Sequence, residues 1–151
     1  HEDQTDWCME KLNKRKVPAM AFFHMPPAEF KEAYEKMKLG DHTVIYEHGS
    51  IGEKDEYFGI SNRPPHFFEK AVDNGWLKWI FCGHDHLNTL SLTYKGIRMT
   101  YGMSIDYLGY SGIAKQYIQR GATLITRKTD GNIDITMVPL TTVVSTRVRG
   151  A

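Results

Sequence analysis

The chain has 151 residues, of which 41% are hydrophobic and 25% are charged, so it has the composition of a globular domain with one core. With 19 basic and 18 acidic side chains, its formal net charge is +1, and no broad electrostatic field indicates a nucleic-acid partner. No apolar run approaches the roughly twenty residues that span a bilayer, so no membrane segment is expected.

The first residues contain neither an initiator Met nor the apolar segment of a signal peptide, so we expect the chain to be cut from a longer protein. Its two cysteines, Cys8 and Cys82, are too few for a disulfide framework. Cys82 lies in an apolar run and is expected to pack as a small hydrophobic residue. These features leave the cellular compartment open.

Helices and strands are expected to alternate in the first half of the chain. Thr5 to Lys14 has the apolar spacing of a helix, and Val17 to Phe23 is a short apolar run typical of a buried strand. Ala28 to Lys38 is rich in helix formers and follows two prolines, which suit a helix start. Gly40 to Pro65 shows no sustained periodicity and predicts a long loop.

The second half begins with a helix from His66 to Asn74 and a buried strand from Leu77 to Cys82, and then changes to successive strands. Lys-Gly and Asp-Gly turns indicate two hairpins. Their strands are predicted at Asn88 to Tyr94, Ile97 to Tyr101, Ala122 to Lys128 and Ile133 to Val138. Gly102 to Gly121 predicts a second long loop, and Thr141 to Ala151 a frayed tail.

Histidines follow both of the predicted buried strands. His24 comes after the first, and Gly83-His84-Asp85-His86 comes after the second. Ligands of open α/β sheets gather beyond the carboxyl ends of the strands, and in an extended segment His84 and His86 would project to the same side. A His-x-His pair alone is equally a surface or hydrogen-bonded couple. The third histidine favours a metal site, since imidazole suits metals such as Zn, Fe, Ni or Mn.

Two motifs carry a family resemblance. Gly83-His84-Asp85-His86, followed by Asn88, resembles the last motif of the calcineurin-like metallophosphoesterases. The segment from Ala21 to Pro26, which contains His24, resembles the preceding histidine motif of their purple-acid-phosphatase-like branch. The resemblance implies an α/β fold, the carboxy-terminal half of a calcineurin-like αββα sandwich with two mixed sheets flanked by helices. It assigns residues 1–140 to this half-domain and residues 141–151 to a tail.

The resemblance also implies a function. It predicts a metal-dependent phosphatase that acts on phosphomonoesters through two divalent or trivalent metal ions (Fe, Zn or Mn) and a metal-bound hydroxide. His24 and His84 would bind one metal and His86 the other. Tyr107 and Tyr110 are weaker candidates for substrate binding, and Asp85 is expected to be solvated or structural.

Three earlier motifs of the family do not occur in this sequence: Asp-x-His, Gly-Asp-x-x-Asp or -Tyr, and Gly-Asn-His. Without their bridging aspartate and catalytic histidine, we expect these residues to be inactive alone. The expected partners are a phosphorylated substrate and the missing amino-terminal half of the same domain. The alternative is a non-catalytic fragment or interaction module that associates through an uncovered sheet edge, as a homo-oligomer or by domain swapping.

Overall fold

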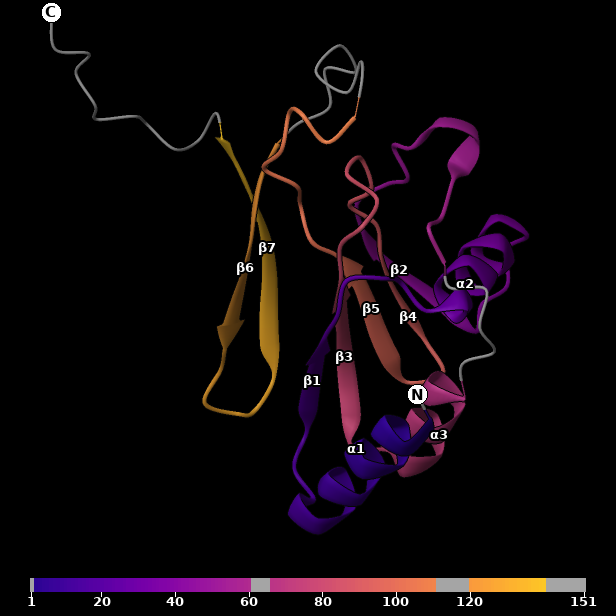
Figure 1. Cartoon of the computed structure of the whole chain (residues 1–151), viewed down its shortest axis with the longest axis vertical. Helices are drawn as coiled ribbons and strands as arrows, with labels where there is room; N and C mark the ends of the chain where they lie inside the picture. The colour runs from indigo at the N-terminus through magenta and orange to yellow at the C-terminus, as the bar shows by residue number, and fades with distance from the viewer. Residues whose placement is uncertain (1, 61–65, 111–119, 141–151) are drawn as a thin grey trace, which may run out of the picture. The chain divides into compact units, whose positions relative to one another are not determined.

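The structure is a computed structural model that describes residues 2–60, 66–110 and 120–140. The chain divides into two compact units between Gly102 and Met103. The first unit combines helices with a sheet, and the described part of the second contains an antiparallel pair of strands (Figure 1). None of the described helices has the length and apolar character needed to cross a membrane.

The sheet of the first unit is mixed, with strand order β1-β3-β5-β4-β2. Its strands are β1 (Ala19–Phe22), β2 (Val44–His48), β3 (Leu77–Cys82), β4 (Ser91–Tyr94) and β5 (Ile97–Tyr101). β3 runs parallel to both β1 and β5, whereas β4 is antiparallel to β5 and β2. The helices are α1 (Glu2–Arg15), α2 (Ala28–Lys38) and α3 (Phe67–Asn74), with a short 3-10 turn η1 (Lys54–Glu56).

One face of this sheet forms the hydrophobic core. Ile80 of β3 is in register with Met99 of β5, which is in register with Leu92 of β4, so these side chains point to the same face. All three are fully buried, as are Phe30 of α2 and Phe68 of α3. Figure 1 shows α2 beside β2 and β4, and α1 packed with α3. The apolar sides of the helices thus cover the sheet as their spacing predicts.

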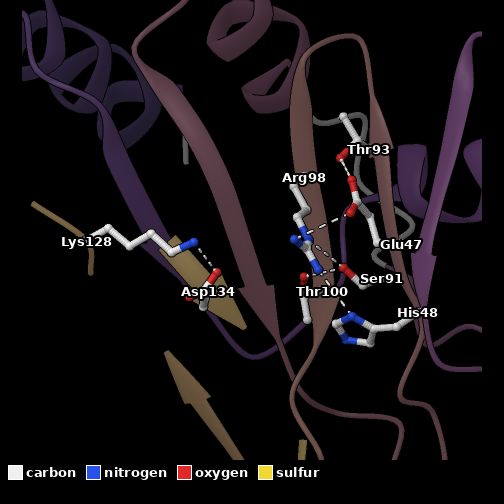
Figure 2. A network of polar contacts seen from close by, with 8 residues as sticks. All are labelled: Glu47, His48, Ser91, Thr93, Arg98, Thr100, Lys128 and Asp134. Atoms are coloured by element: carbon white, nitrogen blue, oxygen red, sulfur yellow. Dashed lines mark hydrogen bonds and ion pairs between the residues drawn. The ribbon is translucent and has the colours of Figure 1, made fainter. Parts of the chain in front are cut away.

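The opposite face of the sheet carries a polar network around Arg98 of β5 (Figure 2). Its Nε donates to Ser91 Oγ at 3.0 Å, and its Nη2 lies 3.2 Å from His48 Nδ1. A terminal nitrogen also lies 3.5 Å from a carboxylate oxygen of Glu47. Because these partners come from β4 and β2, the guanidinium links three neighbouring strands. A mostly covered charge is tolerated when it is paired in this way.

The second unit is described through β6 (Gly121–Arg127) and β7 (Ile133–Pro139), which pair along their whole length. Lys128 Nζ lies 2.7 Å from Asp134 Oδ1 and closes the hairpin near its turn (Figure 2). This hairpin was predicted from the Asp-Gly turn between its strands.

The fold class predicted from the sequence is confirmed: helices flank a mixed parallel and antiparallel sheet, consistent with part of a calcineurin-like fold. The prediction of a loop throughout Gly40 to Pro65 was wrong at β2, where an edge strand pairs with β4. Its burial pattern lacks alternation because most of its side chains are exposed, so no period-two signal marks it. The half-domain boundary at 140 stays a prediction, and the tail at 141–151 lies outside the described residues.

Candidate functional site

The parallel pairing of β1 and β3 places the ends of the two strands side by side. The ladder continues past the strands, since the Phe23 amide donates to the Phe81 carbonyl at 3.1 Å and the Gly83 amide donates to the His24 carbonyl at 3.0 Å. His24 and His84 therefore emerge at the same edge of the sheet. The sequence argument from strand ends predicted this meeting correctly.

The two imidazoles are in direct contact. Nδ1 of His84 lies 3.1 Å from Nε2 of His24, and the rings are edge to face with centroids 5.0 Å apart. In the absence of a metal, one nitrogen donates and the other accepts, according to the tautomers. Two nitrogens bound to one metal at about 2.1 Å, with tetrahedral to right-angled geometry, lie about 3.0 to 3.4 Å apart. The observed distance fits both a hydrogen bond and a shared metal ion.

The backbone turns sharply at His84. Its φ is 69°, in the left-handed region, and the Asp85 amide donates to the Gly83 carbonyl at 2.9 Å. A hydrogen bond from residue i+2 to residue i around a central residue of positive φ defines a strained γ-turn. The segment is therefore not extended, and the argument that His84 and His86 project together as alternating strand residues does not apply.

Asp85 is buried directly behind this turn, with 5% of its surface exposed. Its two carboxylate oxygens accept from the Gly59 amide at 3.1 and 2.9 Å, and Oδ2 also accepts from the Tyr101 hydroxyl at 2.5 Å. Burial, followed by this hydrogen bond, raises the pKa of Tyr101, so the phenol stays protonated and donates. Asp85 has the structural role expected for it rather than a solvated one.

Asn88 connects the histidine segment to the loop between β2 and α3. Its Oδ1 accepts from the amides of Gly52 and Glu53 at 3.0 and 3.1 Å, and its Nδ2 donates to the Tyr57 carbonyl at 3.2 Å. The Leu87 amide donates to Glu53 Oε1 at 3.0 Å. The described loop residues are thus fastened to the histidine segment through fully buried Asn88.

Gly59 lies against the ring of His84. A Cβ at this position would fall 2.0 Å from Cδ2 and 2.5 Å from Nε2 of His84. Any larger residue would require the loop or the imidazole to move. The Cδ2–Nε2 edge of His84 consequently faces the loop, while its Nδ1 faces His24.

The remaining predicted site residues are His86, Tyr107 and Tyr110. His86 is half-buried in the turn after Asp85. Across residues 2–60, 66–110 and 120–140, no group of three or more His, Cys, Asp or Glu side chains is arranged to hold a metal ion. Tyr107 and Tyr110 belong to the second unit and are 47% and 41% exposed. The metal-binding and substrate-binding roles of these residues stay predictions.

Sequence reasoning missed the support around His84. Gly59 lies in a segment without periodicity, so nothing distinguished it from the other loop glycines. Tyr101 is the last residue of a predicted strand, and nothing in the sequence indicates that its hydroxyl donates a hydrogen bond to Asp85. The one signal in the sequence is an Asp placed directly between two motif histidines.

Comparisons with known proteins give three partial matches. No protein-family model matches the chain, and no solved structure matches it. The chain is 28% identical over 94 residues to "Probable inactive purple acid phosphatase 29" of Arabidopsis thaliana, covering 62% of the chain and 21% of that protein. Identity is 32% over 93 residues to "Probable inactive purple acid phosphatase 28", covering 62% of the chain and 20% of that protein. With "Probable inactive purple acid phosphatase 14" it is 38% over 97 residues, covering 64% of the chain and 21% of that protein.

The chain spans about a fifth of the length of these curated relatives. The comparisons establish a partial likeness to purple-acid-phosphatase-like proteins whose names describe them as inactive. They suggest a phosphatase family and leave catalytic activity open.

Proposed function

We propose that this chain is the carboxy-terminal half of a metal-dependent phosphoester hydrolase of the calcineurin-like class, in its purple-acid-phosphatase-like branch. The observation that supports this most directly is the 3.1 Å approach of His24 Nε2 and His84 Nδ1 at the ends of adjacent parallel strands. Three partial matches to purple-acid-phosphatase-like proteins support the same class.

In this proposal His24 and His84 hold one metal ion, and His86 contributes to a second. The ions are two of Fe, Zn or Mn, because imidazole nitrogen suits these metals. Such a pair supplies Lewis-acid activation of a phosphoryl oxygen and of water. The chain's own histidines fix the position of this chemistry at the sheet edge. Tyr107 and Tyr110 are proposed to contact the phosphorylated substrate, a phosphomonoester.

In this proposal, further ligands of the site come from an amino-terminal half of the same domain. Two adjacent cations need a bridging carboxylate, and Asp85 does not fit that role because both of its oxygens accept hydrogen bonds from Gly59 and Tyr101. We therefore propose that the bridging ligand comes from an amino-terminal half of the same domain. The catalytic histidine of the family motif is expected from the same source.

A second candidate is a non-catalytic interaction module. β1 is an edge strand of the described sheet, and its Met20 and Phe22 are 37% and 63% exposed. Exposed apolar side chains next to an unpaired edge favour association with another chain. The names of the matched relatives, which include the word inactive, are compatible with this alternative.

The full-length protein distinguishes the two candidates. It is assayed for phosphate release from p-nitrophenyl phosphate with Zn²⁺, Mn²⁺ or Fe added, beside His84→Ala and the control His42→Ala. Hydrolysis that His84→Ala abolishes and His42→Ala preserves supports the enzyme. Hydrolysis that survives His84→Ala refutes the proposed ligand. No hydrolysis, together with an oligomer that Phe22→Ser dissociates in size-exclusion chromatography, supports the interaction module.

A further inference from the structure

We propose that Asp85 is a positioning residue that holds His84 in place through a clamp formed by Asp85, Gly59 and Tyr101. The inference concerns the arrangement of the histidine pair, and only its link to metal binding rests on the proposed function. No feature of the family resemblance assigned this role to Asp85.

The first support is the convergence of three hydrogen bonds on one carboxylate. Gly59 approaches both oxygens from the loop side, and the Tyr101 hydroxyl approaches Oδ2 from the end of β5. Hydrogen bonds to a charged acceptor are stronger than neutral ones, and here they join a loop and a strand that are far apart in sequence. A side chain with this set of partners fixes its own backbone position.

The second support is the strain at the neighbouring residue. His84 has a φ of 69° in a γ-turn, a conformation that a non-glycine residue keeps only when its surroundings enforce it. Asp85 provides both parts of that enforcement. Its amide donates to the Gly83 carbonyl and closes the turn. Its buried carboxylate holds Asp85 itself in place, directly after His84.

The third support is the way the clamp acts on the imidazole itself. The Gly59 amide that binds Asp85 belongs to the same residue whose missing side chain leaves room for the His84 ring. Binding of the Gly59 amide therefore also presses the loop against the Cδ2–Nε2 edge of His84. With that edge covered, Nδ1 is directed at His24.

Tyr101, the hydrogen-bond partner of Asp85 at the end of β5, makes the clamp rigid. Tyr101 is fully buried and stacks on Phe30 with ring centroids 4.8 Å apart, so its hydroxyl is held by the core. The position of His84 is therefore fixed by contacts with the packed core as well as by contacts with a loop. Ligands supported by such hydrogen bonds keep their geometry before the metal arrives.

The test compares Asp85→Asn and Tyr101→Phe with the matched control Tyr94→Phe in the full-length protein. Tyr94 also donates its hydroxyl to a carboxylate, Glu32 Oε1 at 2.7 Å, but on a different part of the sheet. Two readouts are taken: the contact between the rings of His24 and His84, by NMR of metal-free protein with labelled histidines, and the affinity for Zn²⁺, by calorimetry. Thermal stability alone is not the readout, because any of these changes can lower it.

We expect Asp85→Asn and Tyr101→Phe to weaken or abolish the ring contact and to reduce Zn²⁺ affinity by about 10- to 100-fold, the usual effect of removing a group that orients a ligand. Tyr94→Phe should leave both readouts at their original values. If Asp85→Asn does not fold, Tyr101→Phe decides the question. A ring contact in Tyr101→Phe that equals that in Tyr94→Phe overturns the proposal. A protein that binds no Zn²⁺ counts against the proposed function, and the metal-free ring contact then decides the clamp alone.

Discussion

Nδ1 of His84 lies 3.1 Å from Nε2 of His24, although the two residues are 60 positions apart in the sequence. Two features of the chain produce this approach. Parallel pairing of β1 with β3 aligns the ends of the strands, and the turn at His84 directs its ring across the gap. The strand pairing and the turn thus bring two imidazole nitrogens to a spacing at which both could bind the same ligand.

Zn²⁺ is therefore expected to stabilise the protein through this pair. At a free concentration about 100 times the dissociation constant, binding to the folded state alone adds about 2.7 kcal/mol to the free energy of unfolding. Zn²⁺ should therefore raise the melting temperature, and His24→Ala and His84→Ala should each remove most of that increase. His42 is exposed in the turn between α2 and β2, so His42→Ala should leave the increase unchanged. Calorimetric melting with and without Zn²⁺ measures this. An equal shift in all variants would place the bound Zn²⁺ elsewhere.

The sequence predicted the strand ends and the meeting of His24 with His84, because both depend on local apolar runs and on a general rule for parallel strands. β2 was not predicted, since an edge strand with exposed side chains has no alternation to detect. The strand predicted from Asn88 begins at Ser91, because Asn88 serves as a loop anchor.

The support of the site was less accessible from the sequence for a different reason. The bonds from Gly59 and Tyr101 to Asp85 join residues 26 and 16 positions away, and such long-range hydrogen bonds leave no periodic signal. The turn at His84 also violates the preference of L-residues for negative φ, so local propensity predicts the wrong backbone. Departures of this kind are expected where a structure supports a functional group.

Gly49 and Gly40 form a matched pair for testing how the loop is held. Both have positive φ, +80° and +77°, but a Cβ at Gly49 would lie 2.0 Å from the Thr89 carbonyl oxygen, whereas one at Gly40 meets nothing within 4 Å. Gly40→Ala should cost about 1 kcal/mol through backbone strain alone. Gly49→Ala should cost about 1 to 3 kcal/mol more, because the loop must also move away from the backbone of Thr89. Urea unfolding of the two variants gives the difference, and equal losses would contradict the close contact.

Phe30 is expected to dominate the stability of the core beside the site. It is fully buried and contacts the rings of Tyr101 and Phe58, with centroids 4.8 and 6.0 Å away. Phe30→Ala should lower the free energy of unfolding by about 3 to 5 kcal/mol through lost burial and a cavity. Leu39→Ala, at a side chain that is 88% exposed, should change it by less than about 0.5 kcal/mol. Chemical denaturation measures both, and a small loss at Phe30 would mean that the core can collapse around the missing ring.

His48 should make the protein less stable in mild acid. Burial, followed by repulsion from Arg98, lowers its pKa below the ordinary value of 6.5. As the pH falls, His48 is protonated in the unfolded chain before it is protonated in the folded protein. The contribution of neutral His48 to the free energy of unfolding is therefore fully present above pH 6.5 and is lost as the pH falls through the lowered pKa. His48→Asn keeps an acceptor for Arg98 but does not titrate. The fall in unfolding free energy from pH 7.5 to about 5 should be smaller in this variant, and an identical fall would exclude His48 as a cause.

Glu29 should show the opposite pH dependence. Burial raises its pKa above the ordinary value of 4.5, and the neighbouring Glu32 and Glu69 carboxylates add to the shift. The folded state then holds the proton more tightly than the unfolded chain, so the group favours folding at low pH and loses that contribution as the pH rises through the raised pKa.

Glu29→Gln removes this titration, and the stability of the variant relative to the original protein should therefore increase between pH 4 and pH 7. The comparison of two pH values cancels any effect of the substitution that does not depend on pH. Glu10→Gln, on an exposed position of α1, is the control. Unfolding free energies at the two pH values decide the matter: a relative stability of Glu29→Gln that is flat or falls with pH would mean that the carboxylate is better solvated than its burial at Oε2 implies.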